Sequence, residues 1–178
     1  MRKVTFGGAS SLDNFFARED DSVDWLMWCD EAAEILKDYW PRIDCMLMGR
    51  KTYEVSQKMN PSGKKYHADM KTYVFSRTLE PGEQDDGVEI VSENVEEFVR
   101  GLKEQEGKEI CLMGGGDLAR TLFEAGLIDE FGLNIHPVLL GSGIPIFHKM
   151  TKQIDLELIE CRPFKNGCVY VLYKVKGK

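Results

Sequence analysis

The sequence predicts an α/β domain with a mostly parallel central sheet flanked by helices and with antiparallel strands at its C-terminal edge. Early in the chain, short apolar runs alternate with amphipathic segments, which is the order expected of parallel strands joined by helices. Near the end, two strand-like runs are separated only by a short segment containing Asn166-Gly167, a typical hairpin turn. Residues 1–178 contain no linker, repeat or low-complexity segment, so we expect a single domain.

The N-terminal elements follow from hydrophobic periodicity. A first strand is predicted at Val4–Phe6 and a long helix at Ser22–Trp40, where apolar residues recur at helical spacing. This apolar stripe consists of Trp25, Trp28, Ala32, Ile35, Leu36 and Tyr39. Pro41 ends the helix, because a proline disfavours helical backbone in the residue before it. Cys45–Met48 then forms a second strand, and Gly49 leads into a short helix.

The middle of the chain continues the alternation. A third strand is predicted at Thr72–Ser76 and a fourth at Val88–Val91, each apolar and rich in β-branched or aromatic residues. The polar stretch Glu80–Gly87 between them reads as a surface loop. Val95–Glu106 has the periodicity of a helix.

After one more strand and helix, the C-terminal part of the chain is predicted to contain strands alone. A buried strand at Ile110–Met113 runs into three glycines, and a helix follows at Asp117–Ala125. Glu130–Leu139 is predicted as the next strand, and Asp155–Cys161 and Cys168–Val175 form the hairpin. These late strands place the antiparallel part of the sheet at one edge.

Composition excludes several classes of partner. The chain has 23 basic and 30 acidic residues, a net charge of -7, which argues against a general nucleic-acid or anionic-membrane surface. The segment Met1–Gly8 reaches glycine before it builds an apolar signal core, and no later stretch has membrane-spanning length. We therefore expect a cytoplasmic protein without nucleic-acid or membrane partners. Five cysteines without a C-x-x-C pair predict free thiols and no metal site.

The most informative motif is the glycine run Gly114-Gly115-Gly116 between a strand and a helix. Glycines at the carboxyl end of a buried strand let phosphate groups approach bare backbone N–H groups at a helix N-terminus. The motif therefore predicts a nucleotide site. The alternative is a tight strand-to-helix turn without a ligand, because short glycine motifs have low specificity.

Two further strand ends carry groups that bind anions. The start of one helix carries two cations and a hydroxyl, in the run Gly49, Arg50, Lys51 and Thr52. Cations at a helix N-terminus oppose the helix dipole and do not stabilise the helix, so their presence favours a phosphate-binding role. Their alternative role is a solvated first turn. Ser76-Arg77 follows the third strand, and an arginine there suits a ribose 2′-phosphate, hence NADPH rather than NADH. The alternative is a surface arginine in a turn.

Because ligands of open parallel sheets collect beyond the carboxyl ends of the strands, all three segments are expected to face one crevice.

Taken together with other segments of the chain, these motifs resemble the dihydrofolate reductase superfamily. The segments that carry the resemblance are Met48–Glu54, Phe75–Arg77, Met113–Gly116, Leu127–Glu130 and Pro137–Gly143. Within that superfamily it is similar to the reductase domain of bifunctional riboflavin-biosynthesis enzymes, through Ser11–Ala17, Asp24–Leu26 and Leu140–Phe147.

The resemblance implies a dihydrofolate-reductase-like fold, NADPH as cofactor and a homodimer. It implies an activity like that of 5-amino-6-(5-phosphoribosylamino)uracil reductase, with hydride transfer to a small heterocyclic or ribosyl substrate. It also implies a cis peptide between Gly114 and Gly115. The residues that it assigns to the cofactor are Ala9, Phe16, Gly49, Arg50, Lys51, Thr52, Ser76, Arg77, Met113, Gly114, Gly115, Gly116, Asp117 and Leu118.

The substrate side is open at the level of sequence. By analogy with the carboxylate on the first helix of dihydrofolate reductases, Asp30 is the candidate proton donor, with water as the alternative. Helical spacing instead places Asp30 opposite the apolar stripe, with Glu34 and Lys37, as part of a solvated face. Zinc deaminase motifs are missing, so only the reductase half is expected. The functional alternatives are reduction of a pterin and NADPH binding without catalysis.

Overall fold

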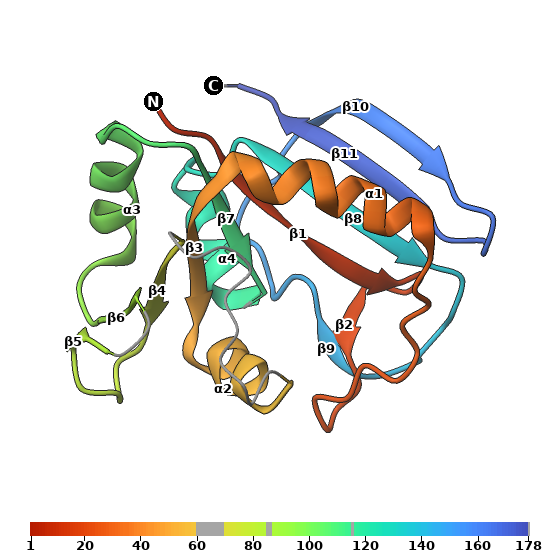
Figure 1. Ribbon diagram of the computed structural model, residues 1–178, viewed down its shortest axis with the longest axis horizontal. Helices are drawn as coiled ribbons and strands as arrows, with labels where there is room; N and C mark the ends of the chain where they lie inside the picture. The colour runs from red at the N-terminus through yellow and green to blue at the C-terminus, as the bar shows by residue number, and fades with distance from the viewer. Residues whose placement is uncertain (60–69, 85–86, 115, 178) are drawn as a thin grey trace.

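The computed structural model describes residues 1–59, 70–84, 87–114 and 116–177. Over these residues the chain forms a nine-stranded sheet in the order β10-β11-β8-β1-β7-β3-β4-β6-β5 and a separate pair, β2-β9 (Figure 1). The strands are β1 (Val4–Ser11), β2 (Phe15–Ala17), β3 (Ile43–Gly49), β4 (Lys71–Phe75), β5 (Gly82–Glu83), β6 (Val88–Val91), β7 (Glu109–Met113), β8 (Glu130–His136), β9 (Ile144–Pro145), β10 (Leu156–Pro163) and β11 (Val169–Val175). The helices are α1 (Asp30–Tyr39), the short 3-10 helix η1 (Trp40–Arg42), α2 (Arg50–Met59), α3 (Val95–Glu104) and α4 (Gly116–Glu124).

Strand directions confirm the predicted fold class. β1 pairs in parallel with β7 and β8, and β3 pairs in parallel with β7 and β4, which in turn pairs with β6. β11 runs antiparallel to both β8 and β10 at the C-terminal edge. The short β5 pairs antiparallel with β6 at the opposite edge.

Successive side chains of β1 point to opposite faces of the sheet, and each face packs against different helices. Val4 and Phe6 are fully buried and belong to one core cluster with Val99 of α3 and Leu118 and Leu122 of α4. The other face of the same strands lies under α1, which crosses β1 and β8 in front of the sheet while α4 lies behind it (Figure 1). A second cluster on the α1 side contains Met46, Met48 and Cys111, packed against Tyr39, Trp40 and Tyr53.

An aromatic cluster attaches the β2-β9 pair to the main sheet. The ring of Phe6 lies 5.9 Å from that of Phe16 in an edge-on arrangement and stacks on Phe131 at 5.5 Å. Phe147 and Phe123 complete the cluster. Such aromatic pairs stabilise by about 0.5–1.5 kcal/mol each beyond the area they bury. They fix Phe16, and with it β2, beside the carboxyl end of the sheet.

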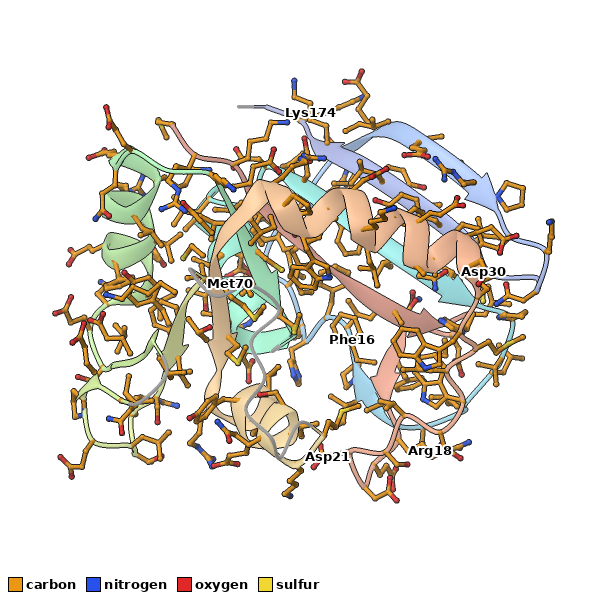
Figure 2. All side chains as sticks on the ribbon, viewed as in Figure 1. Phe16, Arg18, Asp21, Asp30, Met70 and Lys174 are labelled. Carbon is orange, nitrogen blue, oxygen red and sulfur yellow. The ribbon has the colours of Figure 1, made fainter. Side chains whose placement is uncertain are left out.

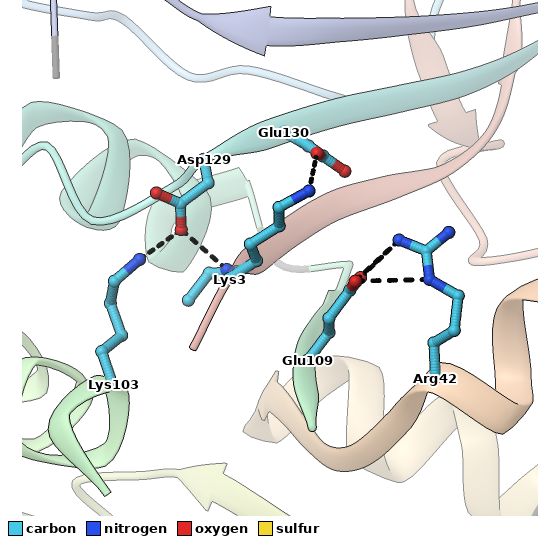
Figure 3. Close-up of polar contacts among 7 residues, drawn as sticks. Lys3, Arg42, Lys103, Glu109, Asp129 and Glu130 are labelled. Atoms are coloured by element: carbon cyan, nitrogen blue, oxygen red, sulfur yellow. Dashed lines mark hydrogen bonds and ion pairs between the residues drawn. The ribbon is translucent and has the colours of Figure 1, made fainter. Parts of the chain in front are cut away.

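Charged side chains hold the amino end of the sheet (Figure 3). The buried Lys103 donates to the Leu127 carbonyl at 3.1 Å and pairs with Asp129, which accepts from the backbone N–H of Val4 at 2.8 Å. Lys3 donates to Glu130 at 2.7 Å. Arg42 of η1 donates to both carboxylate oxygens of Glu109, at 2.8 and 2.7 Å. This network leaves the opposite, carboxyl end of the sheet uncovered.

The helix predicted at Ser22–Trp40 is wrong over its first part, because α1 begins only at Asp30. Tertiary contacts explain the difference. Trp25 is buried with its ring edge-on to His136 at 5.3 Å, and the backbone N–H of Met27 donates to His136 Nδ1 at 3.2 Å. These contacts hold the segment in a non-helical path, and Cys29 has extended backbone just before the helix.

Strand boundaries also differ from the predictions. β1 extends to Ser11, because it pairs with β8 along its length as far as His136. The strand predicted to reach Leu139 ends at His136, since Pro137 has no N–H to donate. β5 lies inside the predicted Glu80–Gly87 loop. No helix within the described ranges combines the length and hydropathy that crossing a membrane requires.

Candidate functional site

A cleft of about 1320 Å³ opens at the carboxyl ends of β3, β4, β6 and β7, beside Gly7 and Gly8 in the middle of β1. It brings together most of the residues that the sequence assigned to a cofactor. These are Phe16, Gly49, Arg50, Lys51, Thr52, Ser76, Arg77, Met113, Gly114, Gly116, Asp117 and Leu118. Gly115, and with it the peptide that joins it to Gly114, lies outside the described residues. Ala9 lines a second cavity rather than this cleft.

The first wall of the cleft comes from the β3–α2 junction. β3 ends at Gly49 and α2 begins at the next residue, so Arg50, Lys51 and Thr52 occupy the first turn of the helix. Arg50 pairs with Glu54 at 2.5 Å, one turn along. This geometry aims backbone N–H groups and two cations at the same space, which suits a phosphate.

The β7–α4 junction lies against the first. Gly114 has a positive φ of +60°, and a Cβ there would lie 2.7 Å from Thr52 Oγ1. Gly116, the first residue of α4, approaches the carbonyl of Ile146, which a Cβ would meet at 2.9 Å. Both glycines therefore allow contacts that a side chain would prevent, and they leave the N-terminus of α4 open to the cleft.

At the end of β4, Ser76 and Arg77 have different roles. The buried Ser76 hydroxyl oxygen accepts hydrogen bonds from the backbone N–H groups of Thr78 at 3.1 Å and Leu79 at 3.0 Å. Ser76 therefore holds the turn. Arg77 is exposed on that turn and lines the cleft.

The second cavity, of about 350 Å³, lies between α1 and the sheet. Part of its floor is bare backbone at Gly7, Gly8 and Gly132, and side chains such as those of Thr5 and Cys111 form the rest. A Cβ on Gly7 would lie 2.4 Å from the carbonyl oxygen of Gly132, so the neighbouring strands β1 and β8 exclude a side chain there. Its walls are mainly apolar and are formed by Leu26, Met27, Trp28, Ala32, Ile35, Leu36, Trp40 and Phe164.

The two cavities share one wall. Gly7, Gly8 and Met113 line both of them. The ring of Phe16 backs this wall, because a Cβ on Gly8 would lie 3.2 Å from it. Molecules held in the cleft and in the second cavity would meet at these three residues.

The structure does not bring Asp30 to either cavity. It is exposed at the first residue of α1 and is absent from the lining of both (Figure 2). Its helix presents Ala32, Ile35, Leu36 and Tyr39 to the second cavity instead. This matches the solvated-face alternative for Asp30.

The polar end of the second cavity is built on His136 of β8. His136 is 2% exposed, and burial lowers its pKa below the usual value. Its Nδ1 accepts from the Met27 N–H and lies 3.4 Å from Cys168 Sγ, and its Nε2 lies 3.2 Å from the Asn134 side-chain amide. Asn134 and His136 both line the cavity.

Comparison with known proteins identifies the family. Residues 2–170 match the family described as the RibD C-terminal domain. The chain belongs to this family. It is also 34% identical to the uncharacterized protein YyaP of Bacillus subtilis over 99% of this chain and 97% of that protein.

Solved structures show the same fold in other RibD-like and dihydrofolate reductase proteins. A putative riboflavin biosynthesis protein from Shewanella superimposes with a TM-score of 0.80 at 22% identity over 99% of this chain and 100% of that one. A Thermotoga maritima deaminase/5-amino-6-(5-phosphoribosylamino)uracil reductase gives 0.72 at 17% identity, over 98% of this chain but 56% of that one. Enterococcus faecalis dihydrofolate reductase, complexed with NADP(H), gives 0.67 at 18% identity over 98% and 97%.

The cleft of this RibD C-terminal domain is also lined by residues that sequence reasoning missed. Arg120 lies one helical turn after Gly116, lines the cleft, and has a buried Nε without a partner in the described structure. Helical spacing from Gly116 is a signal that could have found it. Ser92 and Asn94 follow β6 and also line the cleft, so the rule of carboxyl strand ends applied to a fourth strand would have found them.

Charge in the cleft differs from that of the whole chain. The cationic side chains lining it are Arg50, Lys51, Arg77 and Arg120, and the acidic ones are Asp21, Glu93 and Asp117. The lining of the cleft therefore has a small excess of positive charge in a chain of net charge -7, although Arg50 is paired with Glu54 and Arg120 with Asp117. In the described part of the chain, His, Cys, Asp and Glu side chains form no group that could hold a metal ion.

Proposed function

We propose that this protein is an NADPH-dependent reductase of the riboflavin-biosynthesis pyrimidine reductase type, acting on a small heterocyclic or ribosyl substrate held under α1. The observation that carries the proposal is the shared wall. A cationic cleft of dinucleotide size and an apolar cavity of small-molecule size meet at Gly7, Gly8 and Met113. Family membership supports the reductase class.

The residues of the cleft fit NADPH. Its volume of about 1320 Å³ exceeds the roughly 300–1000 Å³ of ordinary small-molecule pockets. Arg50, Lys51 and the N-terminus of α4 would hold the pyrophosphate, since each places N–H donors or positive charge at the cleft. Arg77 would hold the ribose 2′-phosphate. When bound, NADPH supplies a hydride to a C=N or C=O carbon of the substrate.

The protein's own part is to orient the substrate and keep water from the shared wall. The glycine floor lets a flat molecule lie against the backbone of β1 and β8, and the apolar wall under α1 excludes water from the reacting carbon. Burial keeps His136 neutral, and its Nδ1 is occupied by the Met27 N–H. We therefore propose that the proton added to the product comes from water and not from Asp30, which lines neither cavity.

Two measurements test this function. Calorimetric titration with NADPH measures binding, and NADPH oxidation is then followed with the ribosylaminopyrimidinone intermediate, dihydrofolate and simple carbonyl compounds. We expect tight NADPH binding and turnover of a heterocyclic substrate. Turnover of dihydrofolate alone favours a pterin reductase, and NADPH binding without any turnover favours a non-catalytic binding protein. Absence of NADPH binding overturns the proposal.

A further inference from the structure

The cavity under α1 has a neutral lining. The polar groups on it are Thr5, Tyr39, Asn134, His136 and Tyr170, and the rest of its described lining is apolar side chain, cysteine or glycine. Burial keeps His136 uncharged. A phosphate held in such a cavity needs cationic or clustered N–H donors, because an uncompensated buried charge costs several kcal/mol or more.

The protonation state of His136 is set by its neighbours. The backbone N–H of Met27 donates to Nδ1 at 3.2 Å, so Nδ1 carries no proton. A neutral imidazole then carries its proton on Nε2. This Nε2–H is a donor, and it lies 3.2 Å from the end of the Asn134 amide.

That donor determines how the Asn134 amide is turned. With the amide nitrogen facing Nε2, two donors oppose one another, and the amide oxygen stays buried with no partner among the described residues. Turning the amide over lets its oxygen accept from Nε2–H and leaves its NH2 group as the unpaired end. An unpaired buried polar group costs about 1–3 kcal/mol, which a ligand acceptor would recover.

Thr5 adds a second unpaired group to the same cavity. Its buried Oγ1 has no hydrogen-bond partner within the described structure, and Thr5 lies on the face of β1 that is covered by α1. The nearby floor is Gly7, Gly8 and Gly132, which leaves flat backbone. The cavity thus offers a flat, apolar slot with an amide donor and a hydroxyl.

We infer that this cavity selects an uncharged planar heteroaromatic substrate that carries no phosphate and presents a carbonyl oxygen or ring nitrogen to the Asn134 amide. His136 is the positioning residue that turns this amide, and Asn134 determines specificity. The inference rests on the proposed function, because the bound molecule is a substrate only if the protein is a reductase. Binding in the cavity can nevertheless be measured without NADPH.

A matched pair of ligands tests the absence of a phosphate. Trp28 and Trp40 line the cavity, so quenching of tryptophan fluorescence reports its occupation. We expect 5-amino-6-(ribosylamino)uracil to bind at least 10-fold more tightly than its 5′-phosphate, in the absence of NADPH. Equal or tighter binding of the phosphate overturns the inference. A failure of NADPH to bind would count against the proposed function and leave these two titrations unaffected.

Two variants test the amide. Asn134→Asp keeps the shape and the acceptor for His136 but removes the N–H donor, and Asn134→Leu removes both. We expect each to weaken binding of the uncharged ring 10-fold or more while NADPH affinity stays within 2-fold. His136→Phe should raise KM more than it lowers kcat, and His136→Gln, whose side-chain amide can still donate to Asn134, should recover part of the loss. Thermal unfolding confirms that each variant is folded, and unchanged ring binding in folded Asn134→Asp overturns the inference.

Discussion

The α-carbon of Gly7 faces the carbonyl of Gly132 so closely that a methyl group on Gly7 would lie 2.4 Å from that oxygen. We expect Gly7→Ala to lower the free energy of unfolding by about 1–3 kcal/mol, because the added carbon overpacks two paired strands. NADPH and substrate affinity should fall together, since Gly7 lines both cavities. Gly49→Ala is the matched control for stability alone, because a Cβ there meets nothing within 4 Å. Equal stability of the two variants in urea denaturation would contradict this.

We expect cofactor preference to depend on Arg77. We expect NADPH to bind much more tightly than NADH, and Arg77→Ala to remove most of the difference by deleting a charge-assisted contact of about 1.5–3 kcal/mol. Calorimetric titration with both cofactors measures it. Arg100→Ala, an exposed arginine of α3 that does not line the cleft, should change neither affinity. Equal affinity of the wild type for the two cofactors would refute the assignment.

The contact between Gly114 and Thr52 can be separated from backbone strain. Gly114 and Gly126 have similar positive φ values, +60° and +67°, but only a Cβ on Gly114 meets Thr52, at 2.7 Å. Gly126→Ala should cost about 1–2 kcal/mol of stability, the penalty for a left-handed residue, and leave NADPH binding intact. Gly114→Ala should cost more and weaken NADPH binding. Similar NADPH titrations for the two variants would show that the contact has no role in binding.

Acid should weaken the hydrogen bonds that the Asp13 carboxylate accepts. Hydrogen bonding to the Ser11 hydroxyl and to the backbone N–H groups of Gly141 and Leu140 lowers the pKa of Asp13 to about 2. A carboxyl whose folded pKa is depressed stabilises the fold above its unfolded pKa of about 3.9, and that contribution is lost as the pH falls towards 2.

Chemical denaturation at pH 7 and pH 3 of the wild type and Asp13→Asn measures this effect. We expect the wild type to be the more stable at pH 7 and the difference to shrink at pH 3. Asp38→Asn removes a charge from an exposed position on α1 and serves as the control. A difference that is the same at both pH values would rule out Asp13 as the titrating group.

We expect a homodimer that uses the C-terminal edge of the sheet. β11 is paired on both sides, so β10 is the outer strand, and its Leu158 and Ile159 are 54% and 51% exposed. An exposed apolar edge strand favours pairing with another chain. Sedimentation at micromolar concentration should give twice the 20.3 kDa of one chain, and Ile159→Lys should shift it to monomer. Leu139→Lys, at an exposed loop leucine, is the control, and a wild-type monomer would contradict the prediction.

The parts of the fold that follow local pattern could be predicted from the sequence. The strand, glycine and cation order at Gly49, Arg50 and Lys51 placed a helix N-terminus at the cleft, because strand ends and helix starts are encoded within a few residues. The late hairpin and its position at the sheet edge followed from Asn166-Gly167 in the same way.

The second cavity could not be predicted in this way. It depends on contacts of Trp25 and Met27 with His136, more than a hundred residues away in sequence. These contacts hold the first part of the predicted helix in a non-helical conformation. It also depends on Gly132 facing Gly7 across two strands. Such contacts leave no periodic signal in either segment. The sequence therefore offered only the analogy between Asp30 and the carboxylate of dihydrofolate reductases as a guide to the substrate side.

The linings of the cleft and of the second cavity share Gly7, Gly8 and Met113, and their other residues can be substituted independently. Side chains of α1, and Leu26, Met27 and Trp28 just before it, contribute to the lining of the second cavity alone, whereas the first turns of α2 and α4 contribute to that of the cleft alone. Substitutions at Met27, Trp28 or Leu36 can therefore give the protein a new substrate without altering how its cofactor loops are built. A scaffold divided in this way can come to bind different molecules in the second cavity of different descendants while the cleft stays unchanged.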